Sequence, residues 1–113
     1  KKVNVQQDII EKMGLKKIIP VCGRAEELSV QTNYRSKFDV VISKAVSSLD
    51  KLYLWGNKFM NSNGTMICIK GGKIEEEISS LLKLKKKLSV EVINFDDLRA
   101  YSVEDKKIVV IKN

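Results

Sequence analysis

Two apolar runs decide the fold of this 113-residue chain: Phe38-Asp39-Val40-Val41-Ile42-Ser43 and Thr65-Met66-Ile67-Cys68-Ile69-Lys70. Both are rich in β-branched and other apolar residues without regular polar alternation. Such runs are typical of strands buried on both faces, as in a parallel sheet. They therefore predict two buried strands of an α/β sheet.

A helix is expected on either side of the second run. Ser47 or Ser48 can cap a helix between the two runs, and Asn-Ser-Asn-Gly at 61–64 predicts a turn before the second run. Gly71-Gly72 ends that run, and 73–87 predicts a helix with acidic residues first and lysines last, which complements the helix dipole. The expected apolar faces of these helices consist of Leu49, Leu52 and Tyr53 in one, and Ile74, Ile78, Leu81, Leu82 and Leu88 in the other.

Further from the two runs, the pattern predicts one helix and three strands. Apolar residues recur every four positions over 5–13, which indicates an amphipathic helix, and Gly14 is placed to end it. The run 18–22 predicts a short strand, and Pro20 favours an edge position for it. Two more strands are expected at 89–95 and 107–112, joined by a loop that contains Asp96, Asp97 and Arg99.

The order of these elements predicts an α/β sheet with right-handed crossovers. No helix separates the last two strands, so they are expected to run antiparallel. That ending is typical of Rossmann-like methyltransferases, in which the last strand inserts antiparallel beside its predecessors. The expected fold is a mostly parallel sheet with an antiparallel last strand.

Composition limits the chemistry and suggests a partner. The chain has 21 Lys and Arg against 14 Asp and Glu, a formal charge of +7, which favours nucleic acid as partner; the alternative is that lysine is simply the default solvated residue. The absence of histidine excludes the Ser-His-Asp triad and the common His-based zinc sites, and no metal site is expected. Cys22 and Cys68 are expected to be buried, reduced thiols in a cytosolic protein.

Membrane association is not expected either. No apolar run approaches about 18 residues, the length that a membrane-spanning helix needs. The first residues do not form a signal-peptide pattern, in which a charged stretch precedes an apolar one. The sequence therefore predicts a cytoplasmic protein.

Three loops follow consecutive predicted strands: Gly23-Arg24-Ala25-Glu26-Glu27, Ser43-Lys44-Ala45-Val46 and Lys70-Gly71-Gly72. Open α/β sheets bind ligands at the carboxyl ends of their strands, so the loops are expected to line one edge. Each loop taken alone could equally be an ordinary turn. We expect Ala25, Glu26, Lys44 and Gly71 to lie together at that edge.

Four segments together resemble a known family. "VCGRAEEL" (21–28), "FDVVISKAVSSLDKL" (38–52), "GTMICIKGG" (64–72) and "DKKIVVIK" (105–112) are similar, in this order, to segments of the bacterial 16S ribosomal RNA guanine-N7 methyltransferases. The resemblance covers essentially the whole chain. It implies S-adenosylmethionine (SAM) as methyl donor, 16S rRNA or the small ribosomal subunit as partner, and guanine N7 as acceptor.

The resemblance also implies roles for individual residues. Cofactor contacts are implied for Ala25, Glu26 and Lys44, and RNA contacts for Arg24, Lys70, Gly71 and Lys106. Lys44 and Lys106 stand where the family usually has arginine. No residue is assigned a catalytic role, because guanine N7 carries a free lone pair and the transfer needs alignment rather than a general base.

The family's glycine-rich loop and ribose-binding carboxylate have no counterpart here. Residues 1–113 are therefore expected to be the C-terminal part of a single methyltransferase domain, inactive alone and unable to bind SAM with useful affinity. Either 18–22 pairs with 38–43, or an unpaired sheet edge remains that favours a dimer. The rival hypotheses are a non-enzymatic basic α/β module that binds RNA or protein, and another nucleotide-dependent α/β enzyme.

Overall fold

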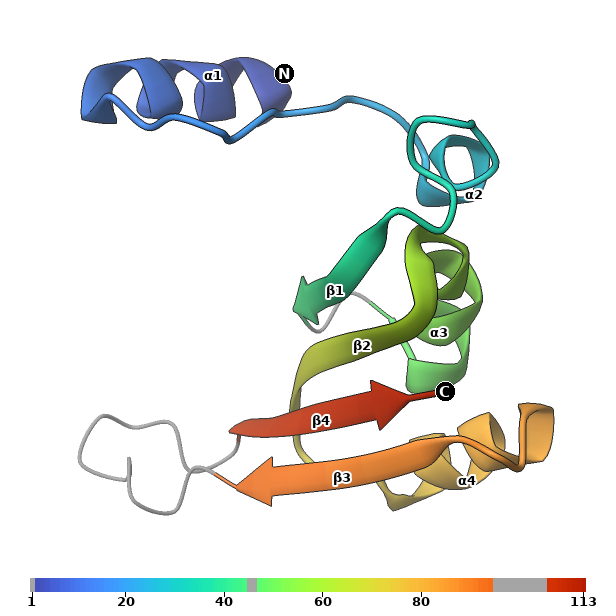
Figure 1. Cartoon of the computed structure of the whole chain (residues 1–113). Helices are drawn as coiled ribbons and strands as arrows, with labels where there is room; N and C mark the ends of the chain where they lie inside the picture. Colours follow the sequence, from blue (N-terminus) through green and yellow to red (C-terminus); the bar gives the residue numbers. More distant parts are fainter. Residues whose placement is uncertain (1, 45–46, 95–105) are drawn as a thin grey trace.

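A computed structural model describes residues 2–44, 47–94 and 106–113 of the chain (Figure 1). The expected loop residues Asp96, Asp97 and Arg99, and Ala45 and Val46 of the second loop, lie outside the described residues. The elements in chain order are α1 (Lys2–Met13), α2 (Ala25–Leu28), β1 (Phe38–Lys44), α3 (Leu49–Gly56), the 3-10 turn η1 (Asn57–Phe59), β2 (Met60–Gly71), α4 (Glu75–Leu84), β3 (Ser89–Asn94) and β4 (Lys106–Lys112).

The four strands form one mixed sheet in the order β1-β2-β4-β3. β1 pairs parallel with β2, and β4 pairs antiparallel with both β2 and β3. Three strands therefore point the same way, and the last strand is reversed and inserted between its two predecessors. This arrangement confirms the predicted α/β fold with an antiparallel last strand.

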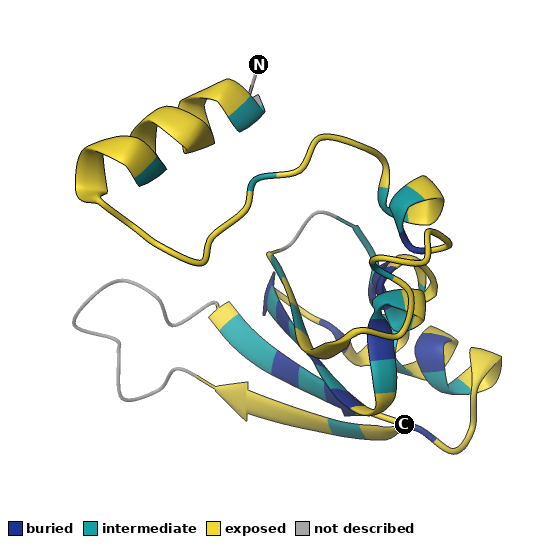
Figure 2. Cartoon of the chain, turned by 45° about the horizontal axis from the view of Figure 1, so that its top comes forward, coloured by how far each residue is buried: buried dark blue, intermediate teal, exposed yellow. Residues whose placement is uncertain are grey.

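The helices α3 and α4 cover the same face of the sheet, which we call the closed face. Along β2, Met66 and Cys68 are buried while the alternating Ile67 and Ile69 are only partly buried, because successive side chains point to opposite faces. Figure 2 shows the buried residues gathered between the helices and the sheet. This core joins the two helices to β2 and β4 through Leu49, Leu52, Tyr53, Ile74, Leu81, Met66, Cys68, Val109 and Ile111. The predicted apolar faces of both helices are confirmed.

The opposite face of the sheet has no helix packed on it among the described residues, and we call it the open face. Strand register places on it Val40, Ile42, Ile67, Ile69, Ile108 and Val110. Ile42 of β1 is 68% exposed. The expectation that the run 38–43 is buried on both faces is therefore wrong, because helices cover only one side and β1 lies at the edge of the sheet.

The first helix ends as predicted. Gly14 adopts the left-handed conformation (φ +62°), Leu15 N–H donates to the Ile10 carbonyl at 3.0 Å, and Gly14 N–H donates to the Glu11 carbonyl at 3.2 Å. This is the Schellman pattern of a helix C-terminus. The apolar stripe of α1 is nevertheless exposed (Figure 2).

The predicted strand at 18–22 is not formed. Ile19 is 83% exposed, and the segment pairs with no described strand. Pro20 supplies no backbone N–H to a ladder, and apolar content alone does not create a pairing partner. The outer edge of β1 therefore remains unpaired in the described part of the chain, which is the second of the two outcomes considered from the sequence.

The predicted turn at 61–64 lies inside β2 instead of before it. The register jumps from Phe38↔Met60 to Val40↔Thr65, so extra residues of β2 bulge out between these pairs. Asn63 N–H donates to the Asn61 side-chain carbonyl at 3.0 Å, which is the local turn chemistry that asparagine favours. The residues at 61–64 do form a local turn, but β2 pairs with β1 on both sides of it, so the turn is a bulge within the strand.

The helix predicted at 73–87 is shorter than expected. α4 ends at Leu84, and Lys85 is already extended (φ −146°, ψ 100°). The chain must turn here because Leu88 returns to the core. The last helix of the structure therefore stops before most of the lysines that were expected in its final turn.

Candidate functional site

Three of the predicted site residues lie together at the carboxyl end of the parallel strands. Lys44 ends β1, Gly71 ends β2, and Lys106, which begins β4, pairs with Gly71. Lys44 pairs with Ile69, two residues before Gly71, so both lysines lie on the open face and flank the end of β2. Both lysines are exposed, and Gly71 between them adds no side chain. The arrangement forms a basic edge that an anionic ligand can approach.

Lys70 does not belong to that basic edge. Its pleat position points it to the closed face, where the residue is only 8% exposed. Its Nζ lies 3.0 Å from Glu77 Oε1 and donates to the Ser47 carbonyl at 2.6 Å. The expectation that Lys70 joins Arg24, Lys44 and Lys106 in one basic surface is wrong. The ammonium group of Lys70 is buried and forms an internal ion pair with Glu77.

The Lys70–Glu77 pair organises the start of α3. Glu77 Oε1 also accepts a hydrogen bond from Leu49 N–H at 3.0 Å, so a side chain from α4 satisfies an amide that the helix leaves unpaired. Ser48 is the N-cap residue, as one of the two sequence alternatives had it, but its hydroxyl makes no cap bond. It donates instead to Asp50 Oδ1 at 2.5 Å, and this bond lowers the pKa of the Asp50 carboxyl.

Ala25 and Glu26 begin α2, which Figure 1 shows beside the start of β1, whereas Lys44 lies at the end of that strand. Arg24 precedes them as the N-cap residue, and its carbonyl accepts from Leu28 N–H at 2.9 Å. Ala25 lines one hollow together with Ser43, the residue before Lys44, and Glu26 does not line it. The expectation that Ala25 and Glu26 share an edge with Lys44 and Gly71 stays a prediction.

The residues implied for the cofactor do not form a cavity that fits it. Ala25 lines a hollow of about 180 Å³ on the closed face, together with Ser43, Trp55 and other mostly apolar side chains. Lys44 alternates to the opposite face, and Glu26 is exposed. Sites for ligands of nucleotide size usually measure about 300–1,000 Å³ and bring several polar groups together. The described residues therefore do not fit SAM.

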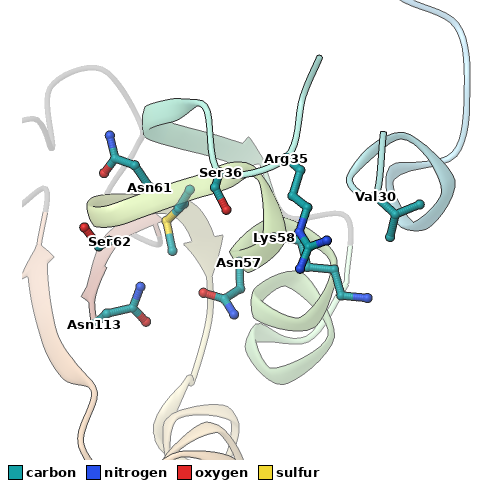
Figure 3. Close-up of a pocket in the computed structure, with 9 residues that line it drawn as sticks. Val30, Arg35, Ser36, Asn57, Lys58, Asn61, Ser62 and Asn113 are labelled. Atoms are coloured by element: carbon teal, nitrogen blue, oxygen red, sulfur yellow. The ribbon is translucent and has the colours of Figure 1, made fainter. Parts of the chain in front are cut away.

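A cavity of about 460 Å³ lies at the other end of β1 and β2, and the sequence gives no signal for it. Arg35, Lys58 and several asparagines line it (Figure 3). Its residues come from four separate segments, so no local sequence motif predicts the cavity. In the sequence, the asparagine-rich stretch at 61–63 indicates only a turn.

The two cysteines differ from each other. Cys68 is buried in the core, and burial raises the pKa of its thiol to about 11. Cys22 is exposed, so the expectation that both are buried is wrong for Cys22. Across the described ranges, no three Cys, Asp or Glu side chains gather where they could hold a metal ion. None of the described helices is long and apolar enough to cross a membrane.

The sheet order, the single reversed strand inserted between two parallel ones, and the basic edge at their carboxyl ends define part of a Rossmann-like methyltransferase. Comparison with known proteins agrees and is more specific. The family described as rRNA small subunit methyltransferase G matches residues 1–108. The chain belongs to this family.

Curated relatives carry the name ribosomal RNA small subunit methyltransferase G. The chain is 32% identical over 116 residues to that of Clostridium novyi, covering 99% of the chain and 46% of the relative. It is 31% identical over 113 residues to that of Thermoanaerobacter sp. strain X514, covering 99% and 47%. It is 35% identical over 98 residues to that of Mycoplasma capricolum, covering 87% and 41%. The chain thus spans about half the length of these relatives.

Proposed function

We propose that this chain is the C-terminal part of a methyltransferase domain that modifies 16S rRNA in the small ribosomal subunit. The proposed methyl donor is SAM and the proposed acceptor is guanine N7. The observation that carries the proposal is the family match over residues 1–108, which the sheet order supports independently. A guanine N7 needs no deprotonation before it accepts a methyl group, which suits a chain without histidine.

Within this function, the basic edge is the part of the chain proposed to face RNA. Lys44 and Lys106 supply two exposed charges on one face of the sheet, and Gly71 leaves room between them for a phosphate or base to approach. Lys70 acts indirectly, because its ion pair with Glu77 holds the start of α3 behind that edge. The RNA role of Arg24 and the cofactor roles of Ala25, Glu26 and Lys44 rest on the resemblance alone.

The test of the activity is methyl transfer from labelled SAM to small ribosomal subunits that lack the modification, with the native polypeptide that contains this chain. The expected product is 7-methylguanosine in 16S rRNA, identified by chain cleavage at that base. Lys44→Gln should lower the rate, whereas the matched charge loss Lys83→Gln on exposed α4 should not. Label at another atom, or no label at all, would contradict the proposal.

The 113-residue chain by itself is expected not to bind SAM usefully. The residues implied for the cofactor do not converge, and ligand affinity depends on several prearranged groups acting together. Isothermal titration of the chain with SAM checks this expectation. Micromolar binding would show that the described residues suffice and that the cofactor sits elsewhere than proposed.

A second candidate function is RNA binding without catalysis. It is favoured by the formal charge of +7 together with the missing cofactor cavity in the described residues. The methyl-transfer assay separates the two candidates, since a binding module would retain RNA affinity while transferring no label. Both candidates place the protein in the cytoplasm, with the ribosome.

We also propose that a second copy of the chain can pair with the outer edge of β1. That edge pairs with no described strand, and its open-face residues Val40 and Ile42 are exposed. An exposed strand edge presents unpaired backbone N–H and C=O groups, which can form hydrogen bonds with a strand of another chain. Self-association at raised protein concentration is therefore expected.

A further inference from the structure

We propose that the 460 Å³ cavity at the amino-terminal end of β1 and β2 binds a phosphate group of an RNA backbone. The inference rests on the proposed function for its RNA substrate, but it concerns a different part of the molecule. The basic edge at Lys44 lies at the opposite end of the strands. At about 3.3 Å per residue, the seven residues of β1 separate the two places by about 20 Å.

Polar residues from three separate stretches of the chain, 35–36, 57–62 and 113, line the cavity (Figure 3). The segment before β1 contributes Arg35 and Ser36, and η1 contributes Asn57 and Lys58. The start of β2 and the residue after β4 supply the remaining polar side chains, which are Asn61, Ser62 and Asn113. Such a convergence of polar groups from distant segments is characteristic of binding sites.

The charge of the cavity is unbalanced. Arg35 and Lys58 both line it, and none of the side chains that line it is acidic. Figure 3 draws both basic side chains among the residues that line the cavity. Within the described ranges the only ion pair is Lys70–Glu77, so no described carboxylate neutralises either charge. Two cations at one cavity attract an anion.

A backbone hydrogen bond joins the two segments that carry the cations. Ser36 N–H donates to the Lys58 carbonyl at 2.8 Å, which ties the residue after Arg35 to Lys58. Ser36 also has a positive φ of 55°, a conformation that a non-glycine residue keeps only where its surroundings enforce it. The backbone positions of Arg35 and Lys58 are therefore linked, while both side chains remain exposed.

The carboxamides add donors of defined direction. The Asn113 side-chain oxygen accepts from the Tyr53 hydroxyl at 2.7 Å and from Lys85 Nζ at 3.5 Å, and its Nδ2 donates to no group of the described residues. Asn61 is used differently, because its amide donates to the Asp39 carboxylate and its oxygen accepts from Asn63 N–H. Asn61 therefore stiffens the wall, and it keeps the Asp39 carboxylate engaged outside the set of residues that line the cavity.

These groups suit a phosphate. A guanidinium presents a planar fork of donors that suits phosphate oxygens, and a lysine adds a compact charge beside it. The volume exceeds that of inorganic phosphate and leaves room for the attached sugar or base. A free nucleoside monophosphate shares this chemistry, so the experiment must separate it from RNA.

The test measures binding of a single-stranded 16S-derived RNA oligonucleotide to the chain by fluorescence anisotropy over a range of salt concentrations. The double variant Arg35→Gln/Lys58→Gln should weaken binding about tenfold or more at low salt. The slope of log K against log salt should fall by about 0.7, because the cavity is proposed to take one phosphate and each phosphate neutralised on a single strand contributes about 0.7. Lys58→Arg retains the charge and should bind nearly as the wild type does.

The matched control is the double variant Lys83→Gln/Lys86→Gln, which removes two charges from exposed positions in and just after α4, away from the cavity. Thermal unfolding of each variant verifies that it folds. If RNA binds but the double variant binds like the wild type, the inference is wrong while the proposed function stands. If AMP binding is lost in the double variant but RNA binding is not, the cavity takes a free nucleotide and the RNA assignment is overturned. If the wild-type chain does not bind RNA at all, both the cavity assignment and the proposed RNA contact of the chain are contradicted.

Discussion

The two faces of the sheet are made by the same four strands, yet they differ in almost every physical respect. On the closed face, Met66, Cys68, Val109 and Ile111 alternate into a core that α3 and α4 complete. On the open face, the neighbouring residues of the same strands are equally apolar but only partly buried or exposed. Apolar strand residues thus contribute stability only where a helix or another layer removes them from water.

The largest expected effect separates the two faces by stability. Leu81 of α4 is fully buried against the core, so Leu81→Ala should lower the free energy of unfolding by about 2–5 kcal/mol through lost burial and the cavity left behind. Ile42→Ala on the open face should cost less than about 1 kcal/mol, because most of that side chain is already in water. Urea unfolding of both variants measures the difference.

Each of the two variants is the control for the other, since both remove part of a large aliphatic side chain. Equal losses would mean that the open face is covered by something that the described residues do not include. That result would abolish the distinction between the faces and would also remove the basis for self-association at β1.

A smaller effect is expected on association. Ile42→Lys places a charge on the exposed open-face edge, where it should oppose pairing with a second copy. The self-association constant from sedimentation equilibrium should fall about tenfold, which corresponds to about 1.4 kcal/mol. The control Leu84→Lys adds the same charge at an exposed apolar position of α4 and should leave association unchanged. A wild-type chain that stays monomeric at high concentration would contradict the proposed pairing.

The same contrast explains what the sequence could predict of the fold. The apolar periods of α3 and α4 and the runs of β1 and β2 identified the central elements, because local pattern and core packing agree there. The run 18–22 looked equally strand-like, but a strand needs a partner edge, and periodicity carries no information on partners. The burial of β1 failed for a related reason, since an apolar run does not reveal which layers cover it.

The candidate site divides in the same way. Strand ends are readable from sequence, and Lys44, Gly71 and Lys106 do share one edge. The ion pair of Lys70 could not be predicted from sequence, because Glu77 and Ser47 approach it from two other parts of the chain. The cavity at Arg35 and Lys58 could not be predicted for the same reason. A backbone hydrogen bond between the segment before β1 and η1 brings these two residues to one cavity.

The smallest effect concerns the start of α3, at the border of the closed face. The Ser48 hydroxyl lowers the pKa of the Asp50 carboxyl from its ordinary 3.8. A carboxyl whose pKa is lower in the folded state stabilises the fold above its unfolded pKa, and this contribution is lost as the pH falls through the folded value. Ser48→Ala should therefore be less stable than wild type near neutral pH, and the gap should shrink below about pH 4.

Thermal unfolding of both proteins between pH 7 and pH 2 measures this gap, and a carboxyl titration by NMR follows Asp50 directly. Ser80→Ala, at an exposed position of α4, is the matched control and should show no pH-dependent gap. Because Asp50 is largely solvated, the effect should be smaller than either of the preceding ones. A gap that persists unchanged to pH 2 would mean that Ser48 acts through the helix start alone. The bond from Leu49 N–H to Glu77, which links this helix start to α4 on the closed face, would then be the contact to test next.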